Sequence, residues 1–172
     1  MQIARAGRDP LPPPMALPTM QITELITPGR VACNIKVGSK RRALELLGGL
    51  IASDLPDLTQ PEVFESLVER ERLGSTGMGR GVALPHGRLK DRPRAVGAFM
   101  KIEGGVDFDA TDSAPVDLIF GLLVPEHSTN EHLQILARLA TMFSDTELCA
   151  SLRNCANRTQ LVRHILDWES RH

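Results

Sequence analysis

The residue types best suited to chemistry lie in a glycine-rich stretch that ends in Pro85-His86-Gly87. The apolar run at residues 82–84 predicts a buried strand, and the proline and glycine after it predict a turn that holds His86 at the strand's end. Pro85 fixes its own φ angle, and Gly87 has no Cβ to crowd a group brought beside the imidazole. A neutral imidazole, with an ordinary pKa of about 6.5, suits nucleophilic or general-base work near pH 7. A purely local hydrogen-bonding role for His86 is the alternative.

A second histidine, His132, falls in the first turn of a predicted helix. Residues 128–131 read Ser-Thr-Asn-Glu, a capping-box pattern that opens the helix. Its predicted buried stripe consists of apolar residues at helical spacing: Leu133, Leu136, Ala140 and Phe143. The backbone N–H groups and the positive dipole end at such a position favour a nearby anion and disfavour protonation of His132. The alternative is a histidine that only occupies a helix start.

Arg70 lies in the last turn of another predicted helix. Residues 59–62 read Thr-Gln-Pro-Glu, a capping box with proline in the first turn, and Gly74 ends the helix. The apolar face of this helix consists of Val63, Phe64, Leu67 and Val68. Arg70 and Arg72 complement the negative C-terminal end of the helix dipole, which is a structural role for both.

Length and composition exclude several classes of function. A chain of 172 residues fits one domain and can bury about 70% of its unfolded surface. Hydrophobic residues make up 42%, and aromatic residues only 3%, so we expect an aliphatic core. The net charge of −1, without a dense run of basic residues, argues against binding to nucleic acid. No apolar run could span a bilayer and the N-terminus lacks a signal-peptide pattern, so we expect a cytoplasmic protein without membrane insertion.

The cysteines and histidines do not match the spacing of a metal or redox site. Cys33, Cys149 and Cys155 are odd in number and lack C-x-x-C pairs, which predicts buried or half-buried free thiols. His127 and His132 are not at the i, i+4 spacing of one helical face, and no H-E-x-x-H occurs. The chain also lacks the phosphate-binding motif G-x-x-x-x-G-K-[ST]. We therefore expect no metal and no cofactor.

The remaining elements alternate between strands and helices, which predicts an α/β fold without internal repeats. Residues 1–20 are rich in proline and predict an extended or disordered leader, followed by a single domain at residues 21–172. After a short amphipathic stretch at residues 22–27, an edge strand is expected at residues 31–37 and a helix capped by Ser39 after it. Further along, strands are expected at residues 95–102 and 116–124, a turn-rich connection at residues 104–112, and helices at residues 145–153 and 159–168, the last with Leu161, Val162, Ile165 and Leu166 inward.

Several segments together resemble the enzyme IIA proteins of the mannitol/fructose class in the bacterial phosphotransferase system. Residues 81–87, Gly-Val-Ala-Leu-Pro-His-Gly, are similar to the active-site motif of that family. Residues 70–79 are similar to its nitrogen-regulatory branch, and the resemblance continues through residues 115–125 and 131–133. It covers roughly residues 20–168 and implies a mixed β-sheet flanked by helices on both faces.

The resemblance also implies roles for the three candidate side chains. His86 is expected to accept a phosphoryl group on its tele nitrogen, the ring nitrogen remote from the backbone, while His132 and Arg70 stabilise the phosphate. The donor is expected to be a small HPr-like phosphocarrier protein. The basic residues Arg88, Lys90, Arg92 and Arg94 predict a solvated loop, or with Arg80 a positive potential that attracts the donor. Arg80 departs from the asparagine that is common in relatives, which leaves the detailed pocket contacts open.

Three functions compete on this basis. The leading one is a regulatory phosphocarrier whose phosphorylation state decides which proteins it binds, such as potassium-transport regulators, sensor kinases or metabolic enzymes. It would act through a phosphohistidine intermediate rather than as a stand-alone enzyme for small molecules. The second is a sugar-specific enzyme IIA that passes phosphate to an enzyme IIB in fructose or mannitol uptake. The third is a metal-dependent hydrolase, or a non-catalytic binding module with the same fold.

Overall fold

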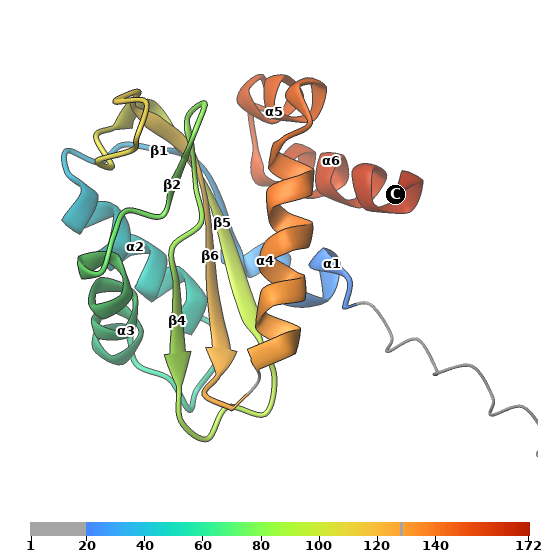
Figure 1. The fold of residues 1–172 in the computed structure, drawn as a ribbon. Helices are drawn as coiled ribbons and strands as arrows, with labels where there is room; N and C mark the ends of the chain where they lie inside the picture. Colours follow the sequence, from blue (N-terminus) through green and yellow to red (C-terminus); the bar gives the residue numbers. More distant parts are fainter. Residues whose placement is uncertain (1–19, 128) are drawn as a thin grey trace, which may run out of the picture.

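The fold is built on a mixed sheet of six strands with the order β1-β5-β6-β3-β2, in which β4 also pairs with β6 (Figure 1). The computed structural model describes residues 20–127 and 129–172. The leader predicted at residues 1–20 therefore lies almost entirely outside the described residues. The strands are β1 Val31–Ile35, β2 Gly77–Gly79, β3 Val82–Ala83, β4 His86–Leu89, β5 Val96–Val106 and β6 Val116–Pro125.

Strand β6 is the centre of the sheet, as its apolar sequence predicts. It runs antiparallel to β5 on one side and parallel to β3 and β4 on the other. β1 lies parallel to β5 at one edge, while β2 forms a hairpin with β3. Eight of the ten residues of β6 are buried because helices cover both faces of the sheet.

Helices cover the two faces of the sheet as separate layers (Figure 1). One core lies between the sheet and α2 and α3, and the other between the sheet and α1, α4, α5 and α6. The predicted α/β fold, a mixed sheet flanked by helices on both faces, is therefore confirmed. Within the described part of the chain, no helix is long and apolar enough to cross a membrane. The helices are α1 Ile22–Leu25, the 3-10 turn η1 Pro28–Arg30, α2 Lys40–Ala52, α3 Gln60–Arg72, α4 Thr129–Phe143, α5 Thr146–Arg153 and α6 Arg158–Arg171.

The two helices on the α2–α3 face begin at the capping residues that the sequence predicts. The Ser39 hydroxyl accepts the backbone N–H of Arg42, at 3.1 Å. Thr59 and Glu62 form a reciprocal capping box, because each side chain accepts a hydrogen bond from the other residue's backbone N–H. These bonds satisfy N–H groups that a helix start otherwise leaves free, and so they fix where α2 and α3 begin. The capping box predicted at the start of α4 includes Ser128, which lies outside the described residues.

The buried stripe of α4 differs from the prediction. Leu133 is 62% exposed, whereas Ile135, Leu139 and Met142 are buried. His132 occupies the first inward-facing position, and the next residue along a helix is rotated by about 100° from it, which turns Leu133 to solvent. Leu166 on α6 was also expected to face inward and is 47% exposed.

The connection predicted at residues 104–112 begins later than expected. Gly104 and Gly105 belong to β5, which continues to Val106 opposite Val116 of β6. Both glycines have φ angles in the left-handed region, at 78° and 72°. They lie in an interruption of the β5–β6 register between Lys101 and Val106, so their backbone forms a bulge rather than a turn out of the sheet.

Candidate functional site

His86 is held in place by a break between β3 and β4. Leu84 and Pro85 separate the two strands, and Pro85 has no backbone N–H to give to the sheet. The N–H of Leu84 donates to the carbonyl of Thr76 in the neighbouring segment, at 3.1 Å, while the Pro85 carbonyl accepts the N–H of Leu122 on β6. The Leu84 carbonyl oxygen lies 2.9 Å from Nδ1 of His86. The break in the strand thus provides a backbone acceptor for the imidazole.

This contact determines which nitrogen of His86 carries the proton. A carbonyl oxygen only accepts hydrogen bonds, so Nδ1 is protonated and Nε2 carries the lone pair. Nε2 in turn accepts the Nε–H of Arg70, at 3.2 Å. The pKa of His86 is lowered from 6.5, first by burial and then by the charges of Arg70 and Arg88, against the opposing effect of the Leu84 hydrogen bond. These contacts favour a neutral imidazole near pH 7, with its lone pair on Nε2 and directed at Arg70.

Arg70 reaches His86 from the last turn of α3, where a second hydrogen bond helps to orient it. Its Nη1 donates to the carbonyl of Gly74 at 2.9 Å. The next residue, Glu71, is a buried carboxylate that accepts the backbone N–H of Thr76 and pairs with Lys40 at 2.7 Å. Glu71 thereby ties the segment that follows α3 to the end of the helix, which holds Arg70 in place. Glu71 is not identifiable from the sequence, because nothing there marks a carboxylate at a helix end as buried.

His132 lies beside His86, with ring centroids 5.2 Å apart and ring planes inclined at 68°. It is buried, and its Nδ1 lies 3.4 Å from Nη2 of Arg88. Its Nε2 is buried without a hydrogen-bond partner among the described residues. Burial lowers the pKa of His132 to about 4, with further contributions from the charges of His86, Arg88 and Arg70. His132 is therefore neutral near pH 7 and has one N–H to offer an anion.

Gly87 also has a packing role that the sequence does not reveal. A Cβ at Gly87 would lie 2.2 Å from Oγ of Ser66 on α3 and 3.1 Å from its carbonyl carbon. The Ser66 hydroxyl also donates to the carbonyl of Arg88, at 3.0 Å. Gly87 therefore lets α3 approach β4 closely enough for Arg70 to reach His86.

His86 begins a strand rather than ending one, and this changes the interpretation of the basic segment after it. Arg88 belongs to β4 and, because side chains alternate along a strand, lies on the same face as His86. If residues 86–89 are assigned to a strand, the sequence alone predicts that Arg88 and His86 share a face. Arg88, Lys90 and Arg94 are exposed, as the sequence predicts, whereas the side chain of Arg92 is only 7% exposed and bonds to Asp57 at 2.7 Å.

Arg80 lies apart from these residues. It occupies the turn of the β2–β3 hairpin at a φ of 57°, a conformation that asparagine adopts more readily than arginine. Its backbone N–H donates to Asp112 and its carbonyl accepts from Arg153. Arg80 precedes Val82, which pairs with Leu118 of β6, whereas His86 pairs with Leu122. The two pairing positions on β6 are four residues apart, which is roughly 13 Å. The cations next to His86 are Arg70 and Arg88 instead.

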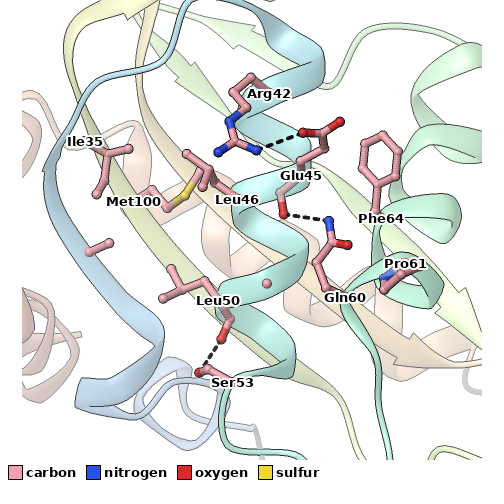
Figure 2. A pocket seen from close by; sticks show the side chains of 12 residues that line it. Ile35, Arg42, Glu45, Leu46, Leu50, Ser53, Gln60, Pro61, Phe64 and Met100 are labelled. Carbon is pink, nitrogen blue, oxygen red and sulfur yellow. Dashed lines mark hydrogen bonds and ion pairs between the residues drawn. The ribbon is translucent and has the colours of Figure 1, made fainter.

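An apolar groove lies elsewhere on the molecule. Figure 2 shows it between β1, α2 and the start of α3, with a lining that includes Ile35, Leu46, Leu50, Phe64 and Met100. Its volume is about 630 Å³. His86, His132 and Arg70 do not line it. Among the residues that the structure describes, His, Cys, Asp and Glu side chains form no group of three or more that could hold a metal ion.

Comparisons with known proteins identify the family of the chain. Residues 24–168 match the family described as "Phosphoenolpyruvate-dependent sugar phosphotransferase system, EIIA 2". A nitrogen regulatory protein of Pseudomonas aeruginosa is 42% identical over 148 residues, which cover 86% of this chain and 96% of the relative.

Solved structures show the same fold. The crystal structure of nitrogen regulatory protein IIA-Ntr from Neisseria meningitidis has a TM-score of 0.78 and 41% identity, and covers 84% of this chain and 98% of that one. Enzyme IIA mannitol of Escherichia coli, in a complex with phosphorylated enzyme IIB mannitol, has a TM-score of 0.69 at 21% identity, and covers 83% and 97% of the two chains. The chain belongs to the EIIA 2 family of the phosphoenolpyruvate-dependent sugar phosphotransferase system, on its nitrogen-regulatory branch.

Proposed function

We propose that the protein is a phosphocarrier in which Nε2 of His86 accepts a phosphoryl group from an HPr-like donor. One observation carries the proposal: the lone pair of a neutral His86 is fixed at Nε2 by the Leu84 carbonyl, in contact with Arg70. The resemblance to enzyme IIA proteins supplies the donor class, and the geometry supplies the nucleophile.

The transfer needs no cofactor. The hydrogen bond from Arg70 to Nε2 breaks as the guanidinium turns to the phosphoryl oxygens, and the Nε2 lone pair attacks the phosphorus of the donor's phosphohistidine in line. The donor's P–N bond breaks with its electron pair returning to the donor ring, which leaves as a neutral imidazole because its other nitrogen carries a proton. The proton of His86 stays on Nδ1, hydrogen-bonded to the Leu84 carbonyl, throughout the transfer, so no general base is required. Such a transfer depends mainly on alignment and on stabilising the charge on three equatorial oxygens.

Arg70 and His132 are proposed to stabilise that charge. The Arg70 guanidinium already contacts Nε2, so its donors lie where the phosphoryl oxygens arrive. His132 is neutral near pH 7 and has an N–H without a partner among the described residues. A donor without a partner can bind the incoming anion without first breaking another hydrogen bond.

The regulatory output follows from the charge of the phosphate. Phosphorylation adds nearly two negative charges to a surface whose nearest cations are Arg70 and Arg88. We propose that this change decides which partners bind, with potassium-transport regulators and sensor kinases as the expected classes. The relative from P. aeruginosa is named a nitrogen regulatory protein, which favours regulation over transport.

A labelling experiment tests the phosphocarrier function. The protein is mixed with an enzyme I-type kinase, an HPr-like donor and phosphoenolpyruvate, and acid-labile phosphate is measured on wild type, His86→Ala and His132→Ala. We expect one phosphate on wild type, slower labelling of His132→Ala and none on His86→Ala. Full labelling of His86→Ala would refute the assignment of the acceptor.

A sugar-specific enzyme IIA remains the second candidate. It is favoured by the fold shared with an enzyme IIA that is solved in complex with its phosphorylated enzyme IIB. Incubation of the phosphorylated protein with fructose-specific and mannitol-specific enzyme IIB distinguishes the two functions. Rapid transfer onto either enzyme IIB would favour sugar uptake, whereas retention of the phosphate on His86 would favour the regulatory role.

A further inference from the structure

We propose that Arg88 fixes the tautomer of His132, so that the one N–H of this imidazole is on Nε2 and available to a phosphoryl group on His86. This assignment rests on the proposed function and adds a positioning residue to it. Arg88 lies two residues after His86 on β4 and reaches His132 on α4. Its Nη2 is 3.4 Å from Nδ1 of His132.

The chemistry of guanidinium decides the direction of this contact. An arginine side chain has N–H donors and no acceptor, and it stays charged at any pH at which the protein folds. Nδ1 of His132 can therefore meet Arg88 favourably only as an acceptor, through its lone pair. The tautomer with a proton on Nδ1 would direct an N–H at a cation, which is unfavourable. The proton of the neutral ring must then reside on Nε2.

The other side of the imidazole explains why this tautomer matters. Nε2 of His132 is buried and has no hydrogen-bond partner among the described residues. A buried N–H without a partner is unfavourable in the resting protein and is available to an anion that enters the site. The rings of His86 and His132 lie side by side, with centroids 5.2 Å apart, so a phosphoryl group on His86 would bring an anion next to the His132 ring.

Arg88 is itself anchored from both sides. Its Nη1 lies 3.5 Å from the carbonyl oxygen of Glu126, in the segment before α4. Its own carbonyl accepts the hydroxyl of Ser66 on α3. The residue thus joins the two helices that contribute Arg70 and His132, which suits a positioning role better than a freely moving surface cation.

The test compares variants that differ in one donor. Arg88→Met removes the guanidinium and keeps an unbranched stem, and Arg88→Lys restores a cationic donor. Lys90→Met is the matched control, because Lys90 is an exposed cation two residues further on that makes no hydrogen bond to His132 among the described residues. The tautomer of His132 is read from two-bond nitrogen–proton couplings in ¹⁵N-labelled, unphosphorylated protein, and the phosphorylation rate is measured with the HPr-like donor.

We expect the Nε2–H tautomer in wild type, in Lys90→Met and largely in Arg88→Lys. Arg88→Met should populate the Nδ1–H tautomer and accept phosphate about tenfold more slowly, the effect of losing one hydrogen bond to a charged group. An Nδ1–H tautomer in wild type would overturn the proposal, as would an unchanged tautomer and rate in Arg88→Met. A tautomer change in a protein that accepts no phosphate would support the link from Arg88 to His132 and refute the phosphocarrier function.

Discussion

Replacing His132 with glutamine should remove a large pH dependence of folding. His132 is 6% exposed, and its pKa falls from 6.5 to about 4 in the folded protein. Between these two values the unfolded chain binds the proton and the folded chain does not. Stability is therefore fully present above about pH 6.5 and is lost as the pH falls toward 4.

The size of the effect follows from the same two values. Their difference corresponds to about 3 kcal/mol once both states are protonated. At about pH 4.5 the unfolded histidine is protonated and most of the folded population is still neutral, so the loss relative to pH 7 is about 2.5 kcal/mol. The variant His132→Gln has no such titration and should not show this loss.

Urea-induced unfolding at about pH 7 and pH 4.5 measures the prediction. Carboxylates also titrate in this range, but they are common to both proteins, so the difference between wild type and variant isolates His132. His127→Gln is the matched control, because His127 is exposed and its variant should keep the pH dependence of wild type. Equal pH dependence in wild type and His132→Gln would refute the reasoning, as would an NMR titration of the His132 ring near pH 6.5.

Three further predictions concern the packing and the site. Gly87→Ala places a Cβ 2.2 Å from Oγ of Ser66, so thermal unfolding should show a loss of about 1 to 3 kcal/mol, whereas Gly38→Ala, with nothing within 4 Å, should change stability little. A Gly87→Ala protein as stable as wild type would contradict the close approach of α3. Arg70→Met should slow phosphorylation roughly tenfold or more while the urea midpoint stays close to that of wild type; an unchanged rate would remove Arg70 from the site. Thr59→Ala should lower the free energy of unfolding by about 1 kcal/mol through loss of the capping box, and an unchanged melting temperature would refute that contribution.

Sequence patterns predicted the features of the fold that depend on local chemistry. The capping residues Ser39 and Thr59 and the apolar run of β6 each act within a few residues of chain, so their effect is visible in the sequence. The exposure of Leu133 was not predicted, because an apolar residue does not reveal which side of a helix its neighbours face. The orientation of α4 depends on contacts with the sheet, which the sequence of the helix alone does not contain.

The candidate site was predicted in part. The sequence and its resemblance singled out His86, His132 and Arg70, and the fold brings these three together from β4, α4 and α3. Arg88 was interpreted as part of a loop because the proline-interrupted basic segment obscured a short strand. Glu71 was missed because its importance comes from burial against Thr76 and Lys40, which only the folded chain produces.

The break between β3 and β4 has a consequence for how tolerant this region is to change. Val82 lies opposite Leu118 and His86 opposite Leu122, so the same offset against β6 holds on both sides of the break. Side chains alternate between the faces of a strand, so adding or removing a single residue in the break would turn His86 toward α3 and Gly87 toward α4. Whether the number of residues here is odd or even thus decides which face carries the imidazole. Natural variation and redesign can alter the residue types in this connection more freely than its length.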